Sequence, residues 1–312
     1  MITLEGFDTV PAHARGSYVA IGNFDGVHRG HAHLLARLAA CARASGVPAL
    51  ALTFDPPPVA LLRPEAAPAP LTWLDRRLDL MRQAGAVEVG IFKTGSWLLG
   101  MTAREFFDRV ILGQLDARGM VEGPTFGFGR DRGGDSELLR SWCAEAGLGF
   151  EVATPTEEQG RIVSSTRIRK ALSEGDAAEA ARLLGRPHRI RGLITHGAGR
   201  GAGIGVPTAN LDGIDTIIPD DGVYAGLAFV EGQRAGIPTA CNIGPNPTFG
   251  EQIRKVEAHL IDFKGDLYGQ TVELDLLQRL RPTRRFAGLD DLLGQIKLDV
   301  EQARLISQEV PG

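Results

Sequence analysis

The chain has 312 residues, of which 43% are hydrophobic and 23% are charged, with a formal net charge of −4. This composition excludes a disordered chain, and the interspersed acidic and basic side chains exclude a general nucleic-acid binder. The length exceeds what one hydrophobic core usually organises, so we expect two domains. The three cysteines Cys41, Cys143 and Cys241 are widely separated, and no apolar run approaches the length of a membrane span. Both features predict a reduced, cytoplasmic protein.

Apolar, strand-like runs alternate with helical patterns in the first half of the chain. The runs lie at 18–22, 49–54, 87–92 and 118–122, and the helical patterns at 31–45, 74–84 and 103–112. This alternation predicts a parallel sheet with helices on both faces, in which ligands bind at the carboxyl ends of the strands. Thr102 followed by Glu105 fits a capping box and supports the start of the third helix.

The segment 22–31, GNFDGVHRGH, directly follows the first of these strands. Its glycines allow a turn with close backbone approach, and the helix expected from His31 points N–H groups and a partial positive charge at an anion. His28 and His31 then donate hydrogen bonds to phosphate oxygens. Two histidines three residues apart can also be metal ligands or surface residues. The preceding strand and following helix favour a nucleotide phosphate site.

Two further segments organise the first half. Prolines at 56–58 and 64–70 predict a stiff covering loop rather than a linker. The pattern at 164–184 predicts a helix that stops at Gly185, Arg186 and Pro187, where we place the boundary between a first domain (1–185) and a second (186–312).

Hydroxyl side chains stand at the start of that helix. Ser165 and Thr166 can simply cap it, because serine and threonine are preferred there. With Arg169 one helical turn away, they can also clamp the β- and γ-phosphates of ATP, since an arginine fork matches phosphate oxygens. Both interpretations are open on the sequence alone.

The second half shows a different pattern. Short β-like runs at 189–195, 223–229, 256–261 and 271–277 are separated by turn residues, and a helical period follows at 289–306. This predicts a small antiparallel barrel or sandwich closed by a terminal helix.

A glycine-rich segment, HGAGRGAGIG at 196–205, leads into Val206-Pro207-Thr208-Ala209-Asn210. It is either a flexible surface loop or a loop whose N–H groups wrap phosphates, with the Thr208 hydroxyl and the Asn210 amide oxygen as magnesium ligands. Strand alternation at 256–260 places Glu257 on the polar face. Its carboxylate can deprotonate an alcohol that attacks the γ-phosphate, or it can be a solvated strand residue.

Together these motifs resemble the bifunctional bacterial riboflavin kinase/FMN adenylyltransferase family, also called FAD synthetase, over essentially the whole chain. The matching segments are GNFDGVHRGH at 22–31, SSTRIR at 164–169, GRG…GVPTAN at 199–210, NIGPNPTF at 242–249 and VEAHLIDFKGDLYG at 256–269. The resemblance implies an α/β amino-terminal domain, a Rossmann-like nucleotidyltransferase, and a carboxy-terminal six-stranded antiparallel β-barrel kinase domain with a terminal helix. It implies that the barrel phosphorylates riboflavin to FMN with Mg-ATP, and that the first domain adenylylates FMN to FAD with release of pyrophosphate.

The resemblance also implies roles for individual residues. The catalytic residues are Glu257, His28 and His31. The ATP-binding residues are Gly22, Phe24, Asp25, His28, His31, Ser165, Thr166, Arg169, Gly197, Gly199, Gly201, Pro207, Thr208 and Asn210, with Thr208 and Asn210 as Mg²⁺ ligands. The flavin-binding residues are Phe54, Thr125, Phe126, Phe128, Arg281 and Phe286.

Two positions depart from the family pattern: Pro57 stands where the family has histidine, and Thr125 where it has asparagine or aspartate. Two alternatives therefore stay open, a riboflavin kinase with an impaired or regulatory adenylyltransferase domain and a non-catalytic flavin-binding sensor or carrier. The expected partners are the small molecules riboflavin, FMN and ATP, with no nucleic acid and no membrane.

Overall fold

The computed structural model describes residues 2–8, 10–86, 88–196, 205–233, 235–245 and 254–309. The chain divides into two compact units, each with its own hydrophobic core. The first unit comprises the described residues of 1–68 and 73–164, and the second those of 69–72 and 165–312.

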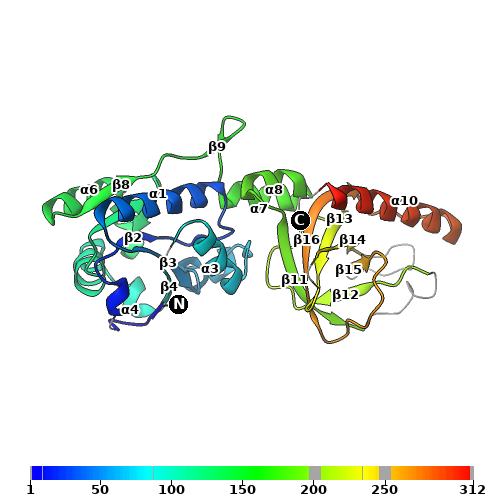
Figure 1. Ribbon diagram of the computed structural model, residues 1–312, viewed down its shortest axis with the longest axis horizontal. Coiled ribbons are helices and arrows are strands. Elements are labelled where there is room, and N and C mark those ends of the chain that lie inside the picture. The colour runs from blue at the N-terminus through cyan, green and yellow to red at the C-terminus, as the bar shows by residue number, and fades with distance from the viewer. Residues whose placement is uncertain are drawn as a thin grey trace. The chain divides into compact units, whose positions relative to one another are not determined.

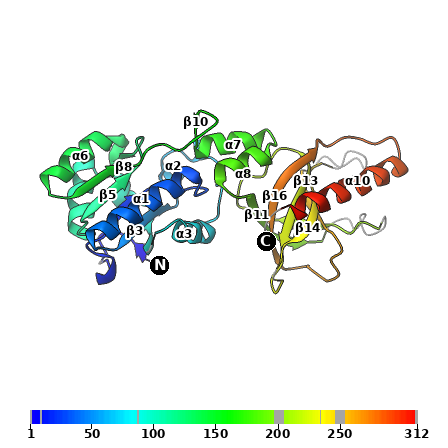
Figure 2. The same ribbon diagram turned by 45° about the horizontal axis from the view of Figure 1, so that its top comes forward.

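A six-stranded parallel sheet forms the centre of the first unit, with strand order β1-β4-β3-β2-β5-β8 (Figures 1 and 2). From β2 the chain builds outward through β3 and β4, and it then returns to place β5 on the other side of β2. The topological switch point therefore lies between β2 and β5, where ligands bind in such sheets. The predicted parallel sheet is confirmed. Its strands are β1 (Ile2–Leu4), β2 (Tyr18–Ile21), β3 (Ala49–Asp55), β4 (Glu88–Lys93), β5 (Gly119–Glu122) and β8 (Gly149–Val152).

Helices cover both faces of this sheet. Ala20 and Ala51 point to the face covered by α1 and α3, whereas Ile21 and Leu52 point to the face covered by η3 and α6. The alternation of neighbouring residues between two cores is what a strand buried on both faces requires. The helices of this unit are η1 (Ala12–Ala14), α1 (Arg29–Ser45), α2 (Pro58–Leu62), η2 (Pro64–Ala66), α3 (Leu74–Gln83), α4 (Ser96–Leu99), α5 (Ala103–Glu105), η3 (Phe106–Gln114), η4 (Arg130–Arg132) and α6 (Ser136–Glu145). The unit also has two small hairpins. One pairs β6 (Gly127–Phe128) with β7 (Gly134–Asp135), and the other pairs β9 (Glu157–Glu158) with β10 (Arg161–Ile162).

Most of the predicted helix ends in this unit are confirmed, and the start of α1 differs because of its cap. The capping box of Thr102 and Glu105 is present in full at the start of α5, which continues as the π-helix η3. Helix α1 begins at Arg29, two residues before the expected start, because His28 caps it. The strand predicted over 87–92 begins at Glu88, and Val87 lies outside the described residues.

The helix predicted over 164–184 is wrong as a single element. The structure has two helices there, α7 (Ser165–Ser173) and α8 (Ala177–Leu184). Gly175 adopts a φ of +77°, which ends α7, and the Asp176 side chain then accepts a hydrogen bond from the Glu179 N–H to cap α8. Gly185 ends α8 as predicted.

We expected the proline-rich segment to be one stiff covering loop, but the structure has short helices in it. It contains α2 and η2, both of which start with a proline in the first turn, where the missing N–H costs nothing. Its last residues belong to the second unit, where the carbonyl of Pro70 accepts a hydrogen bond of 2.8 Å from the Ile217 N–H.

The second unit is a closed six-stranded antiparallel barrel with strand order β11-β12-β15-β14-β13-β16. This confirms the barrel and decides against the sandwich. The sequence did not predict β12, which is short, or β14, which contains Pro238 and so lacks one ladder donor. The strands are β11 (His188–Thr195), β12 (Ala209–Asp212), β13 (Gly222–Phe229), β14 (Ile237–Gly244), β15 (Lys255–Leu260) and β16 (Thr271–Arg281).

The terminal helix α10 (Leu289–Gln308) packs on the outside of the barrel, against β13, β14 and β16 (Figures 1 and 2). Ala303 of the helix meets Ala225 and Ala240 of the strands, and these small side chains allow close approach. Ser307 Oγ donates to the Gly226 carbonyl across the same contact. Within the described part of the chain, no helix is long and apolar enough to cross a membrane.

Candidate active sites

The segment 22–31 forms a loop at the carboxyl end of β2, beside the switch point of the sheet. The Gly22 N–H donates to the Leu52 carbonyl at 3.0 Å, and the Val27 N–H closes a turn on the Phe24 carbonyl at 3.0 Å. Phe24 and Val27 adopt φ values of +44° and +37° although neither is glycine, and both side chains are buried. Such backbone is costly and persists only where the surroundings fix it. The loop is therefore held in one conformation by its packing.

The two histidines of this loop lie at the start of α1, His28 as its N-cap and His31 in its first turn. His28 Nδ1 accepts the hydrogen bond of the His31 backbone N–H at 3.2 Å, and the two rings stack with centroids 3.7 Å apart. An accepting Nδ1 places the proton of a neutral ring on Nε2, so Nε2–H is the donor that His28 can offer a phosphate. A Cβ on Gly30 would lie 3.1 Å from His28 Cε1, which explains the glycine between the histidines.

Asp25, predicted to bind ATP, is buried beside Arg77. Arg77 NH2 lies 3.9 Å from Asp25 Oδ1, and both side chains are largely shielded from solvent. The Arg77 guanidinium also reaches the Phe54 carbonyl at 3.5 Å. Asp25 therefore has a structural partner beneath the loop, and its role toward ATP stays a prediction.

Three of the aromatic residues predicted to bind flavin lie on one core cluster of the first unit. Phe54, which lies in β3, stacks on Phe92 at 5.7 Å, and Phe126 stacks on Phe128 at 5.4 Å. Phe106 of η3 lies between the two pairs, 6.5 Å from Phe92 and 5.8 Å from Phe128. The structure thus joins residues that are more than seventy positions apart into one aromatic row. In the neighbouring turn, the Thr125 carbonyl accepts a bond from the Arg132 guanidinium.

Ser165, Thr166 and Arg169 lie in the first five residues of α7, in the second unit. Arg169 Nε donates to the Ala69 carbonyl at 2.9 Å. Because the histidines belong to the first unit, the joint action of the two motifs on ATP stays a prediction.

The barrel brings Glu257 between two asparagines. Glu257 of β15 pairs with Asn210 of β12 on one side and with Asn242 of β14 on the other. Directly opposed residues of neighbouring strands point to the same face of a sheet. The three side chains are half-buried, whereas the flanking Val256 and Ala258 are buried in the barrel, so the predicted alternation is confirmed. The result is a row of one carboxylate and two amides on the outer face.

Asn242 is the residue of this row to which the sequence assigned no role. It lies in the segment NIGPNPTF, of which 246–249 fall outside the described residues. Its position beside Glu257 depends on the register of β14 against β15, which the sequence does not display. Thr208 and Pro207 directly precede β12, and the Pro207 carbonyl lies 2.7 Å from His259 Nδ1. Gly197, Gly199 and Gly201 lie outside the described residues.

Arg281, the last residue of β16, and Phe286, five residues beyond it, are predicted to cover the flavin. Arg281 makes an ion pair of 2.7 Å with Asp299 of α10, and both side chains are largely buried. Its guanidinium also lies 5.5 Å from the centre of the Phe286 ring. The ion pair fixes the start of the segment that carries Phe286 to the terminal helix.

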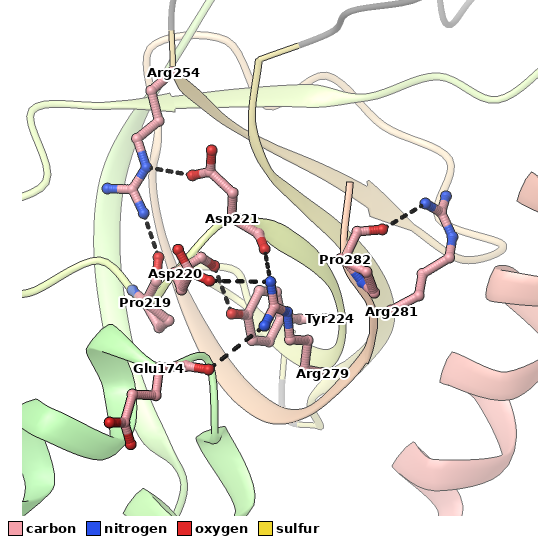
Figure 3. A network of polar contacts seen from close by, with 9 residues as sticks. All are labelled: Glu174, Pro219, Asp220, Asp221, Tyr224, Arg254, Arg279, Arg281 and Pro282. Atoms are coloured by element: carbon pink, nitrogen blue, oxygen red, sulfur yellow. Dashed lines mark hydrogen bonds and ion pairs between the residues drawn. The ribbon is translucent and has the colours of Figure 1, made fainter. Parts of the chain in front are cut away.

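A second arginine of β16 joins several segments of this unit (Figure 3). Arg279 NH2 donates to Asp220 Oδ2 at 3.1 Å and to the Asp221 carbonyl, while NH1 reaches the Glu174 carbonyl at 3.5 Å. Arg254 in turn donates to Asp221 Oδ1 at 2.7 Å. The network ties the end of α7 to the barrel strands.

Two family models match this chain, one in each half. The family model for FAD synthetase matches residues 10–167, and the model for riboflavin kinase matches residues 184–307. The chain is 38% identical to the bifunctional riboflavin kinase/FMN adenylyltransferase of Pseudomonas fluorescens, over 98% of each chain, and 36% identical to that of Escherichia coli K12, over 93% of this chain and 92% of the other. The chain belongs to the bifunctional riboflavin kinase/FMN adenylyltransferase family.

As a member of this family, the protein phosphorylates riboflavin to FMN and adenylylates FMN to FAD, with ATP as the second substrate. The Bacillus subtilis member is 33% identical over 92% of this chain and 91% of its own. A sensor without catalysis is therefore not retained. The effect of Pro57 and Thr125 on the adenylyltransferase rate is a separate question, which FAD formation from FMN by the purified protein decides.

A solved structure from Streptococcus pneumoniae, described as a macrolide-efflux protein, also shares the fold. It is 32% identical, covers 97% of this chain and 99% of its own, and has a TM-score of 0.86. Its name belongs to that protein, and the two family models above assign flavin chemistry to this chain.

Proposed function

We propose that Glu257 is the general base of riboflavin phosphorylation. The carboxylate accepts the proton of riboflavin's 5′-hydroxyl while that oxygen attacks the γ-phosphorus of ATP and the bond to the bridging oxygen of ADP breaks. The observation that supports this is the cross-strand row, in which Asn210 and Asn242 flank Glu257 on a half-buried face. Two neutral amides orient the carboxylate without neutralising it.

Thr208 and Asn210 are the proposed Mg²⁺ ligands. A hydroxyl and an amide oxygen next to a carboxylate are hard oxygen donors, which suits this ion, and so few protein ligands leave coordination positions for phosphate oxygens and water. When bound, the ion neutralises charge on the transferring phosphoryl group. Gly197, Gly199 and Gly201, which lie outside the described residues, are proposed to bind the phosphates through their N–H groups, and Pro207 is proposed to restrict the chain before Thr208.

For adenylyl transfer, we propose that His28 and His31 stabilise the charge on the α-phosphate. An oxygen of the FMN phosphate attacks the α-phosphorus of ATP in line, and pyrophosphate leaves. The stacked rings at the N-terminus of the 17-residue helix α1 support this, because the helix end itself favours an anion. Ser165, Thr166 and Arg169 are proposed to bind the β- and γ-phosphates.

The other residues that we propose to bind nucleotide or flavin also fall into two groups, one in the first unit and one in the barrel unit. Gly22, Phe24 and Asp25 shape the nucleotide loop of the first unit. Phe54, Phe126 and Phe128 are proposed to offer apolar area to the FMN ring, and Thr125 a single hydrogen bond. Arg281 and Phe286 are proposed to hold riboflavin over the barrel.

At the level of the whole chain, we propose an adenylyltransferase domain of 1–185 and a kinase domain of 186–312. The compact units divide twenty-one residues earlier, so α7 and α8 belong to the compact unit of the barrel, although this proposal counts them in the adenylyltransferase domain. We further propose a cytoplasmic enzyme whose partners are its small-molecule substrates, with no nucleic-acid or membrane partner.

The test is a time course of riboflavin, FMN and FAD with Mg-ATP, started separately from riboflavin and from FMN. Glu257→Gln should lower FMN formation by a factor of about 100 or more and leave FAD formation from FMN unchanged. His31→Asn should do the reverse. Gln278→Ala, which removes an exposed amide from β16, is the control and should alter neither rate. A Glu257→Gln variant with the full kinase rate would contradict the assigned base.

A further inference from the structure

A buried carboxyl lies where β2 and β5 diverge. Glu122 is the last residue of β5 and is 2% exposed. The two strands pair at Tyr18 with Gly119 and at Val19 with Met120. Beyond that point, the Ile21 N–H, which points toward β5, donates to the side chain of Glu122 at 2.9 Å. The Glu122 side chain thus replaces a ladder bond at the switch point of the sheet.

The next residues after Ile21 form the nucleotide loop, and a second buried side chain holds them from β3. Thr53 Oγ1 donates to the Asn23 carbonyl at 3.0 Å, and Thr53 is fully buried. The positive φ values of Phe24 and Val27 require firm support from the surroundings. Glu122 and Thr53 give polar support to the start of the loop from the strands on either side.

The environment of Glu122 favours its neutral form. Burial raises the pKa of this carboxyl well above its usual value, and the opposing effect of the Ile21 N–H bond is smaller. From α6 the carboxyl faces the Cys143 thiol, whose pKa burial raises to about 11, with the Glu122 charge adding to the effect. From β8, Glu151 points to the other face of the sheet, toward Arg37 of α1. From β2 the titratable side chain is Tyr18, at the opposite end of the strand.

We propose that Glu122 is a positioning residue for adenylyl transfer, which in its neutral form fixes the start of the nucleotide loop and on ionisation releases it. An ionised carboxylate in this apolar cluster has to reach solvent or gain a cation, and either change moves the Ile21 N–H bond. The proposal rests on the assignment of the 22–31 loop to ATP. Riboflavin phosphorylation in the barrel does not use this loop.

The experiment compares the pH profiles of both activities in one protein. FAD formation from FMN should fall as the pH rises through the raised pKa of Glu122, whereas FMN formation from riboflavin should not fall there. Glu122→Gln keeps an acceptor oxygen and cannot ionise, so it should keep the rate below that pH within about twofold and lose the fall. Glu122→Leu removes the acceptor and should lower kcat/KM for ATP in adenylyl transfer by roughly tenfold. Cys143→Ala is the matched control and should keep the fall.

Three results would overturn the proposal: a fall with rising pH that persists in Glu122→Gln, one that disappears in Cys143→Ala, or a Glu122→Leu variant with the wild-type rate. Hydrogen exchange of the 18–31 amides in the whole protein gives a readout that needs no turnover. Glu122→Leu should lose protection there and Glu122→Gln should keep it. If wild-type protein made no FAD while this exchange pattern held, the proposed adenylyl-transfer function of the loop would have failed, whereas the contact by which Glu122 fixes the start of the loop would stand.

Discussion

The two sites are built in different ways. The nucleotide site of the first unit uses one continuous segment, 22–31, whose turn, cap and histidines are neighbours in the chain. The kinase site of the second unit uses single residues of three strands, Asn210, Asn242 and Glu257, which only the barrel register brings together. A continuous site depends on local backbone geometry, whereas a cross-strand site depends on the integrity of the whole barrel. The two activities should therefore respond to different kinds of damage.

The largest expected effect on stability comes from breaking the ion pair between Arg281 of the barrel and Asp299 of α10. Asp299→Ala leaves the Arg281 guanidinium largely buried without its carboxylate, which should destabilise the second unit by about 3 kcal/mol. Differential scanning calorimetry should show the transition of this unit at a lower temperature, with that of the first unit unchanged. Glu301→Ala, an exposed change on the same helix, is the control. Equal shifts of both transitions would contradict separate support for the two sites.

Local geometry can be damaged at Gly30 without touching the barrel. A Cβ there meets His28 Cε1 at 3.1 Å and Nδ1 at 3.2 Å, and the ring is already held by its cap bond and by stacking. Gly30→Ala should lower FAD formation from FMN by about 10- to 100-fold and leave riboflavin phosphorylation unchanged. Gly294→Ala adds the same methyl group to a helix where nothing lies within 4 Å and should have no such effect. Full activity in Gly30→Ala would show that the histidine positions are not critical.

A substitution at Asn242 tests whether the row of Asn210, Glu257 and Asn242 is needed for the kinase reaction. Asn242→Ala removes one of the two amides beside Glu257 and should lower the kinase kcat by roughly tenfold, because one of the polar side chains proposed to orient the carboxylate is lost. Adenylyl transfer from FMN should not change. A kinase rate equal to that of the Gln278→Ala control would remove Asn242 from the site.

The smallest effect concerns the anchoring of α1. Arg37 donates to both carboxylate oxygens of Glu151 on β8 and holds the pKa of that carboxyl below its usual value. The pair therefore stabilises the folded state above the unfolded pKa of Glu151, and this contribution is lost as the pH falls through the lowered value. Arg37→Met should slightly reduce the unfolding temperature of the first unit at neutral pH and not in acid. Exposed Arg63→Met should show no such pH dependence.

The same contrast explains what the sequence could predict. Helix α1, the glycine stop at Gly185, the capping box at Thr102 and the position of the histidines follow from residues that are close in the chain. The missed features depend on contacts between distant segments. Asn242 reaches Glu257 through strand register, and Glu122 reaches Ile21 across 101 positions. The break at Gly175 was missed because the apolar period continues on both sides of it.

If the two sites of this chain are separable, each can be disabled without the other. The most direct test mixes two purified variants, Glu257→Ala and His31→Ala, and follows riboflavin to FAD with Mg-ATP. Neither variant alone should make FAD from riboflavin, whereas the mixture should, because FMN made by the His31→Ala protein is adenylylated by the Glu257→Ala protein. A mixture that makes no FAD, or a single variant that has lost both activities while still folded, would contradict the separation of the two sites.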